Sequence, residues 1–327
     1  MHDSESSGEL RWHPLLRQWV GVAAARQGRP QLPEDWCPFC PGSGQVPEHY
    51  DVHLYANDFP AFRFENPAFS PEGGELFQAT GARGASDVVL YSSDHRRLPS
   101  ELTSDQWEKV IGLWTKRSVE LFSRTDVQYV SIFENAGLAI GVTMPHPHGQ
   151  IYAFPFVPPL VQTELDSAAA YYHERARCLY CRILDSEIED GRRLVESNDS
   201  FVALLPFFGR FPTELQIYSR RHVQNLADLN LRERGRLASI LKIVRQKFDN
   251  LYGFAMPLMM LVRQAPAQGT HGYFHFHIDF LPIQRSPTKL KYLAAVESGC
   301  GTFLNDTRAE QQAELMRNAE PRTVPGV

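Results

Sequence analysis

The 327-residue chain has a globular composition, with 43% hydrophobic and 22% charged residues, and its length suits two domains or one large one. Its formal net charge of −5 excludes a broad basic surface for nucleic acid, so local arginines must hold any nucleotide. No apolar run approaches the roughly 20 residues of a membrane span, and the acidic segment MHDSESSGELRW lacks the apolar core of a signal peptide. We therefore expect a cytoplasmic protein that has no membrane partner.

In chain order, the first half begins with Cys37 and Cys40 in CPFC. A stretch rich in Pro, Gly and charge at 64–85 predicts a long loop, and VVLYSSDH, which ends at His95, predicts a strand. Eight residues later, Thr103 is a good N-cap for a helix with apolar residues at helical spacing. These residues are Trp107, Val110, Ile111, Trp114, Leu121 and Phe122. The stretches VQYVSIFENAG and GQIYAFPF predict further strands.

The segment 158–177 opens with two prolines, continues with a helical pattern and is the expected connector. Beyond it the elements recur: Cys178 and Cys181 in CLYC, a strand that ends at His222, and a helix capped by Asn230. MPLMMLV and YFHFHIDFLP then predict strands, as in the first half.

The order C-x-x-C, His, H-x-H thus occurs twice, because His146 follows His95 by 51 residues and His275 follows His222 by 53. We expect an α+β fold of two halves, each an antiparallel sheet with one long helix packed on it. The expected division is an N-terminal half, 1–157, a connector, 158–177, and a C-terminal half, 178–327.

The cysteine pairs favour zinc, since C-x-x-C pairs in a reducing cytosol hold metal or do redox chemistry, and no thioredoxin-like context surrounds them. Cys37, Cys40, His95 and His146 form a plausible Cys2His2 set that leaves no coordination position for substrate, so we expect a structural zinc. The alternative is free buried thiols beside unrelated histidines. Cys300 stays unassigned, as a small residue in a glycine-rich turn.

In TMPHPHGQIYAF (143–154), this zinc set leaves His148 as the reactive member of the histidine pair. Gly149 permits close approach to the backbone, and the Gln150 amide can donate to a phosphate oxygen. A neutral His148 could attack phosphorus. The alternative is an ordinary strand histidine.

HPHGQ, with Asn135 of FENAG thirteen residues before His148, resembles the active-site strand of galactose-1-phosphate uridylyltransferases, in the histidine-triad superfamily. The resemblance extends from RWHPLLRQWVGVAAARQGRP to KLKYLAAVESG. It implies histidine-triad-like halves and a ping-pong reaction, in which His148 takes UMP from UDP-glucose and passes it to galactose 1-phosphate. It also implies that Gln150 contacts the phosphate and that Asn135 helps to hold the nucleotide.

Other residues match the family one by one. Arg26 and Arg29 fit an arginine pair near the nucleotide phosphates, although both could be ordinary surface arginines. The resemblance implies a homodimer whose interface completes the sugar site. The remaining matches are Asn57, Asp58 and Phe59 around the uridine, Gly141, Val142 and Thr143 in the phosphate loop, and Lys291 and Glu297 at the sugar phosphate.

The second metal site departs from one family pattern, an iron site built from a glutamate, a distant histidine and an H-x-H pair. Glu164 and His275 with His277 match that pattern, but Arg263 stands in the distant histidine's place. Cys178, Cys181 and His222 instead favour a second zinc, with iron as the alternative. For its fourth ligand the repeat indicates His275, whereas relatives with two zincs indicate His271, which we favour.

Substrate identity stays open, because Val296 stands where the family has a tyrosine and the following GCGTFLND is not the common ending. One alternative is a nucleotide-sugar phosphorylase or adenylyltransferase of the same superfamily. Another is a zinc-held nucleotide-binding protein without turnover.

Overall fold

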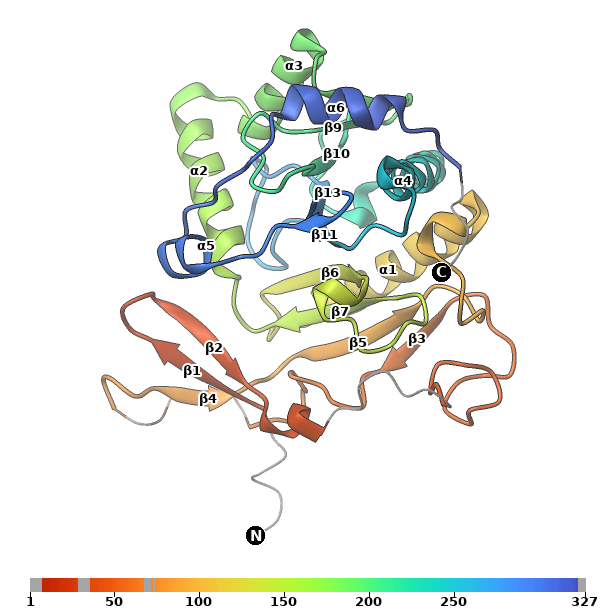
Figure 1. Cartoon of the computed structure of the whole chain (residues 1–327). Coiled ribbons are helices and arrows are strands. Elements are labelled where there is room, and N and C mark those ends of the chain that lie inside the picture. The colour runs from red at the N-terminus through yellow and green to blue at the C-terminus, as the bar shows by residue number, and fades with distance from the viewer. Residues whose placement is uncertain (1–7, 29–35, 68–71, 73, 323–327) are drawn as a thin grey trace.

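The computed structural model describes residues 8–28, 36–67, 72 and 74–322. At its centre is one nine-stranded antiparallel sheet to which both halves contribute (Figure 1). In spatial order its strands are β3 (His53–Ala56), β5 (Ala85–Leu90), β7 (His148–Phe154), β6 (Tyr129–Ala136), β11 (Leu258–Arg263), β12 (His277–Pro282), β10 (Leu215–Ser219), β9 (Phe201–Leu204) and β8 (Leu194–Ser197).

The two halves meet where β6 pairs with β11, with Phe133 opposite Leu261. Outward from this seam the strand order is β6-β7-β5-β3 in one half and β11-β12-β10-β9 in the other, so the sequence repeat is also a repeat of topology. The α+β prediction is confirmed. The two expected sheets are continuous, because pairing of β6 with β11 satisfies the backbone groups that two separate sheet edges would leave open.

The long helices α1 (Ser104–Phe122) and α4 (Leu231–Tyr252) pack against each other and against the same face of the sheet. Their predicted N-caps are confirmed, since the side chains of Thr103 and Asn230 each accept a hydrogen bond from the backbone three residues on. Trp107 and Trp114 of α1 are fully buried in this core. Burial of a large apolar side chain contributes about 1.5–3 kcal/mol.

The opposite face is covered differently in each half. Over the C-terminal half lie α2 (Pro159–Arg175), within the expected connector, and α3 (Leu179–Asp190). Over the N-terminal half lie the loop around the first cysteine pair and a small three-stranded sheet, at the lower left of Figure 1. Its strands are β1 (Glu9–His13), β2 (Gln18–Val22) and β4 (Ala79–Gly81). The expected loop 64–85 therefore contains a strand, because β4 pairs with β1.

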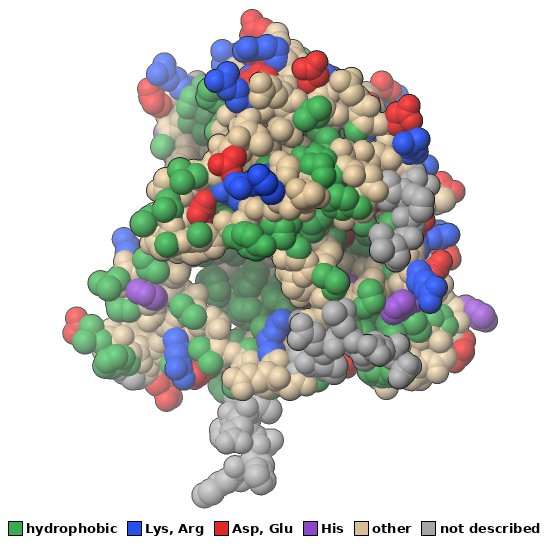
Figure 2. All heavy atoms as spheres, in the orientation of Figure 1, with side chains coloured by type: hydrophobic (Ala, Val, Ile, Leu, Met, Phe, Trp, Pro, Cys, Tyr) green, Lys and Arg blue, Asp and Glu red, His purple; other side chains and the backbone are tan. Residues whose placement is uncertain are grey.

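The remaining elements are short. After β12 come a strand pair and two helices: β13 (Gln284–Ser286), β14 (Lys289–Leu290), α5 (Ala295–Cys300) and α6 (Ala309–Asn318). Helix α6 packs on α4 and β8. The 3-10 turns are η1 (Ala24–Gly28), η2 (Pro99–Glu101), η3 (Leu138–Ile140) and η4 (Leu226–Asp228). Figure 2 shows a hollow with a hydrophobic floor above the small sheet. Among the described helices, none is both long and apolar enough to cross a membrane.

Candidate active site and metal centres

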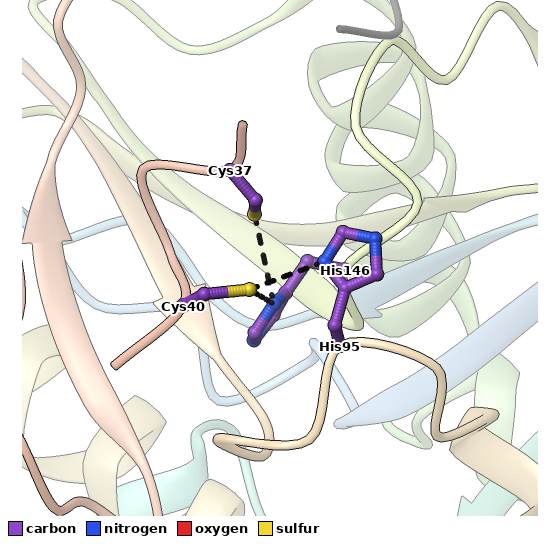
Figure 3. A group of neighbouring side chains, drawn as sticks. All are labelled: Cys37, Cys40, His95 and His146. Atoms are coloured by element: carbon purple, nitrogen blue, oxygen red, sulfur yellow. Dashed lines mark hydrogen bonds between the residues drawn. The ribbon is translucent and has the colours of Figure 1, made fainter. Parts of the chain in front are cut away.

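The first Cys/His group gathers residues from three segments. Cys37 and Cys40 are brought together by a turn in which the Cys40 N–H donates to the Cys37 carbonyl. His95 follows β5, and His146 precedes β7. The four side chains converge, and their potential ligand atoms all lie within 4.8 Å of one another (Figure 3). The structure thus brings together the four residues predicted for the first zinc site.

The orientation and protonation of His146 suit a metal ligand. His146 Nε2 donates to the Ser92 carbonyl oxygen at 2.7 Å, so the unprotonated Nδ1 faces the sulfurs of Cys37 and Cys40, at 3.8 and 3.7 Å. Burial lowers the pKa of His146 to about 4, which keeps the ring neutral, and burial raises the pKa of the Cys37 thiol to about 12. Two cysteine sulfurs, which lose their protons when a metal binds, and two histidine nitrogens are a donor set that fits tetrahedral zinc.

The second group contains Cys178, Cys181, His222 and His275, again within 4.8 Å. His275 Nε2 donates to a backbone carbonyl, that of Ser219, at 2.8 Å, as His146 does in the first group. The preference for His271 as the fourth ligand is wrong. His275, not His271, lies with Cys178, Cys181 and His222, and it has the place of His146 in its H-x-H pair. His271 Nε2 instead lies 2.8 Å from the Gln268 carbonyl oxygen.

His148 is the first residue of β7, and its ring orientation is set by the backbone beside it. Its Nδ1 lies 2.7 Å from the His146 carbonyl oxygen. A carbonyl can only accept, so Nδ1 carries the proton and Nε2 is the unprotonated nitrogen of the neutral ring. Gln150, two residues on, shares this face of β7, and both side chains line a cavity of about 330 Å³. This is the orientation that a histidine nucleophile needs.

The predicted uridine segment lines the same cavity, through Asn57, Asp58 and Phe59. The Asn57 side chain accepts a hydrogen bond from the Phe59 N–H at 3.0 Å, so the segment is an Asx-turn, and the Tyr55 hydroxyl donates to Asp58 at 2.9 Å. The other walls include Trp36, Pro38, Phe39 and Val88. An aromatic-lined cavity of this volume with a few fixed polar groups is typical of a small-molecule site.

A second cavity, of about 200 Å³, also reaches His148. Asn135 and Val142, both predicted near the nucleotide, line it. Gly141 ends η3 with a φ of 82°, a left-handed conformation that favours glycine. Within the described residues, the buried Thr143 hydroxyl makes no hydrogen bond.

The structure brings some predicted residues to His148 and leaves others apart. Arg26 Nη1 donates to the Tyr152 hydroxyl at 3.0 Å, and Tyr152 shares the His148 face of β7. Arg29 lies outside the described residues. Lys291 Nζ pairs with Glu297 at 2.9 Å, but neither residue lines either cavity beside His148.

In the C-terminal half, side chains fill the place that corresponds to the His148 site. His277 is buried and stacks on Tyr218, with ring centroids 5.1 Å apart. Asp279, in the place of Gln150, pairs with Arg263 at 2.7 Å. The histidine in this half is therefore packed rather than presented to a cavity.

Sequence reasoning missed several polar residues around the site. The Tyr50 hydroxyl lies 3.0 Å from His146 Nε2, and the Tyr91 hydroxyl lies beneath Gly149 of β7. Glu134 and Arg245 are buried and line the smaller cavity that reaches His148. One signal was available for Glu134, which stands on the face of its strand that carries Val130 and Ile132. A charged residue at a core position of a strand indicates a special role.

The fold and the site define a class, a duplicated α+β protein in which one histidine of the sheet lines a cavity. Models of the N- and C-terminal domains of galactose-1-phosphate uridyl transferase match residues 3–158 and 164–323. The galactose-1-phosphate uridylyltransferase of Thermotoga maritima is 38% identical over 315 residues, which cover 95% of this chain and 98% of that protein. The chain belongs to the galactose-1-phosphate uridylyltransferase family.

Solved structures support this family assignment. A structure described as that of a uridylyltransferase superposes with a TM-score of 0.88 at 32% identity, covering 95% of this chain and 98% of that one. An ADP-glucose phosphorylase from Arabidopsis thaliana with bound ADP-glucose superposes with a TM-score of 0.75 at 25% identity and the same coverage.

Proposed function

We propose that this chain transfers UMP between UDP-glucose and galactose 1-phosphate in two displacements, through a uridylyl group on His148. The observation that carries this proposal is the 2.7 Å contact between His148 Nδ1 and the His146 carbonyl, which leaves Nε2 as the nucleophile beside the larger cavity. Family membership supports the two substrates.

In the first displacement, Nε2 of His148 attacks the α-phosphorus of UDP-glucose. The bond from that phosphorus to the bridging oxygen breaks, and glucose 1-phosphate leaves with the electron pair. In the second, a phosphate oxygen of galactose 1-phosphate attacks, the N–P bond breaks, and UDP-galactose forms. Gln150 donates a hydrogen bond to a phosphate oxygen. Arg26 and Arg29 supply positive charge that stabilises the negative charge on the phosphate oxygens during each displacement.

The nucleotide occupies the larger cavity in this proposal. Asn57, Asp58 and Phe59 bind the uridine, since they line that cavity and form a rigid turn. Asn135 binds the nucleotide from the smaller cavity. The loop formed by Gly141, Val142 and Thr143 lies next to the phosphates, and the buried hydroxyl of Thr143 is a donor that a phosphate oxygen could satisfy.

Two zinc ions hold the loops around the sheet, one in each Cys/His group, with iron as the alternative in the second. Zinc with four protein ligands supplies stability and takes no part in the transfer. The same groups favour a cytoplasmic location, where thiols stay reduced. We also infer that the chain divides into functional parts at 1–157, 158–177 and 178–327, the first holding the nucleophile.

We further propose a homodimer in which Lys291 and Glu297 of the partner subunit complete the sugar-phosphate site. Two observations support it: these residues line neither cavity beside His148 in their own chain, and large hydrophobic side chains are exposed on two segments. The exposed side chains are Leu15, Leu16, Leu76 and Phe77 on the small sheet and its loops, and Tyr292, Leu293, Val296 and Leu304 near the C-terminus. Exposed apolar patches of this kind mark protein interfaces.

Subunit mixing tests the shared site. His148→Ala and Lys291→Ala chains are each expected to be inactive, but remixing them after unfolding should restore about a quarter of the wild-type sites, because half of the dimers are hybrid and each hybrid has one intact site. Light scattering checks the dimer. No recovery from stable hybrid dimers would contradict the shared site.

Phosphorus NMR of the reaction mixture tests the function. With UDP-glucose and galactose 1-phosphate we expect glucose 1-phosphate and UDP-galactose to appear together. ADP-glucose with inorganic phosphate is the competing substrate pair, because one similar structure is an ADP-glucose phosphorylase. Faster turnover of that pair would move the assignment to the adenylyl alternative, and turnover of neither would favour a binding protein.

A further inference from the structure

Beneath the strand that carries His148, on the helix-covered face of the sheet, lies a buried cluster of ionisable side chains. Tyr91, Glu134, Arg245 and Asp249 are each at most 2% exposed. Arg245 and Asp249 are on α4 of the C-terminal half, whereas Tyr91 and Glu134 belong to the N-terminal half. Charges this deep are costly unless they are paired, so their retention calls for a reason.

The cluster contacts the backbone of the H-x-H-G segment directly. The Tyr91 N–H donates to the Pro147 carbonyl at 3.0 Å, between the two histidines. A Cβ atom at Gly149 would lie only 2.2 Å from the Tyr91 hydroxyl oxygen, so the hydroxyl fills the space beneath the residue that separates His148 from Gln150. Tyr91 therefore sets the closest distance at which the backbone of β7 can approach the helices.

Glu134 stands beside the Tyr91 hydroxyl on this face of the sheet. Phe133 pairs with Gln150, so Glu134, the next residue of β6, falls opposite Gly149, beneath which the hydroxyl lies. Among the described residues this hydroxyl makes no hydrogen bond. Arg245 Nη2 pairs with Glu134 Oε1 at 3.2 Å. Burial raises the pKa of Tyr91 well above its ordinary value, and the neighbouring charge of Glu134 raises it further. The Tyr91 ring also packs against Trp107 and Trp114, with centroids 5.6 and 6.0 Å away. Two tryptophans therefore surround the ring, and a buried ion pair lies near its hydroxyl end.

The C-terminal half offers an internal comparison. Arg263 pairs with His277, the second histidine of its H-x-H pair, and the register of β6 with β7 puts Asn135 opposite His148 in the same way. The residues before them, Glu134 and Val262, therefore correspond. Arg245 lies fifteen residues after its N-cap, and Ser118 has that position on α1. Tyr91 corresponds to Ser219, each following the residue paired with the second histidine. The half with the packed histidine therefore has none of these three groups at the corresponding positions.

The geometry points to Glu134 and Arg245 as positioning residues for the transfer: their ion pair holds Tyr91 beneath Gly149, and Tyr91 sets the path of the strand that presents His148 and Gln150. This inference rests on the proposed function, in which His148 is the nucleophile. Arg245 comes from the C-terminal half. The inference therefore also explains how that half contributes to a site built by the N-terminal half. A buried ion pair adds little to stability compared with apolar side chains of the same volume. We therefore assign this pair the role of fixing the positions of its neighbours.

The test is the double variant Glu134→Gln/Arg245→Met, which removes both charges at nearly constant volume. We expect kcat to fall about 10- to 100-fold, since small misplacement of a nucleophile costs that much, while KM for UDP-glucose changes less than about threefold. The matched control is Arg263→Met/Asp279→Asn, which neutralises the buried pair of the other half and should leave kcat unchanged. Unchanged kcat in the first variant, or equal loss in both, overturns the inference.

Three single variants keep the test decisive if the double variant does not fold. Tyr91→Phe keeps both charges and removes only the hydroxyl, so kcat should fall with little change in Tm. Glu134→Asp should retain more kcat than Glu134→Gln, because it keeps the charge. Wild-type kcat in Tyr91→Phe, or equal kcat in the two Glu134 variants, overturns the inference. A wild-type chain that forms no uridylyl adduct would instead remove the proposed function.

Discussion

The carbonyl oxygen of His146 accepts a hydrogen bond from His148 Nδ1 at 2.7 Å. The same His146 directs its ring into the Cys37, Cys40 and His95 group. One residue therefore joins the Cys/His group to the candidate nucleophile, by its side chain on one side and its backbone on the other. This link gives a metal ion bound by the group a means to affect catalysis without contact with substrate.

His148→Ala should abolish UMP transfer, because no other described side chain presents an imidazole to the larger cavity. Metal content and Tm should stay close to those of the wild type, since the Cys/His group does not include His148. Steady-state assays and elemental analysis check the two halves of this expectation. Turnover near the wild-type rate would contradict the assignment of the nucleophile.

Cys37→Ser and Cys178→Ser form a matched pair, one in each Cys/His group. Each should lower the zinc content by one ion and also lower Tm, because metal binding at a structural site contributes to folding. Only Cys37→Ser should also lower kcat, by about 10- to 100-fold, since only its group includes the residue that orients His148. Unchanged metal content in either variant would remove that group as a metal site.

Gly149→Ala should be strongly destabilising, because its Cβ would lie 2.2 Å from the Tyr91 hydroxyl and 2.9 Å from the ring carbon that bears it. Overpacking costs about 1–3 kcal/mol. Adding Tyr91→Phe should recover part of the loss, since the closest clash disappears and the second remains. Gly112→Ala is the control, because an added Cβ there meets nothing within 4 Å. Urea unfolding measures all four chains, and equal losses for Gly149→Ala with and without Tyr91→Phe would contradict this packing.

Arg263→Met should leave Asp279 buried without its main partner and cost about 3–5 kcal/mol at neutral pH. In the wild type, burial opposes ionisation of Asp279, but the charges of Arg263 and then His277 outweigh burial and lower the Asp279 pKa. The ionised carboxylate therefore stabilises the folded protein above the ordinary carboxyl pKa, and this stabilisation is lost as the pH falls through the lowered pKa. In the variant, burial dominates and raises the Asp279 pKa. The deficit should therefore shrink as the pH is lowered and Asp279 becomes protonated.

Urea unfolding of the wild type and Arg263→Met at pH 7.5 and pH 5.5 measures this trend. A deficit that is equal at the two pH values, or that grows as the pH falls, would contradict a charged Asp279 in the folded protein.

Local sequence signals were sufficient for much of the fold. Thr103 and Asn230 cap helices with clear apolar periodicity, and the repeated C-x-x-C, His, H-x-H order predicted both Cys/His groups up to the choice between His271 and His275. These features depend on residues near one another in the chain or on a repeat, which a single sequence can reveal.

Features that depend on pairing between distant segments were not predictable in this way. The seam between β6 and β11 joins residues such as Phe133 and Leu261, and nothing local distinguishes an edge strand from a strand at such a seam. The pair of Glu134 with Arg245 brings together a strand and a helix from different halves. Its partner could be identified only once the fold had placed α4 against α1.

Intact-mass spectrometry of the denatured protein after mixing with excess UDP-glucose tests the central claim most directly. We predict a mass gain of one UMP, absent in His148→Ala and lost from the wild type when galactose 1-phosphate is added. Transfer without any adduct, or an adduct that persists in His148→Ala, would contradict a uridylyl group carried by His148.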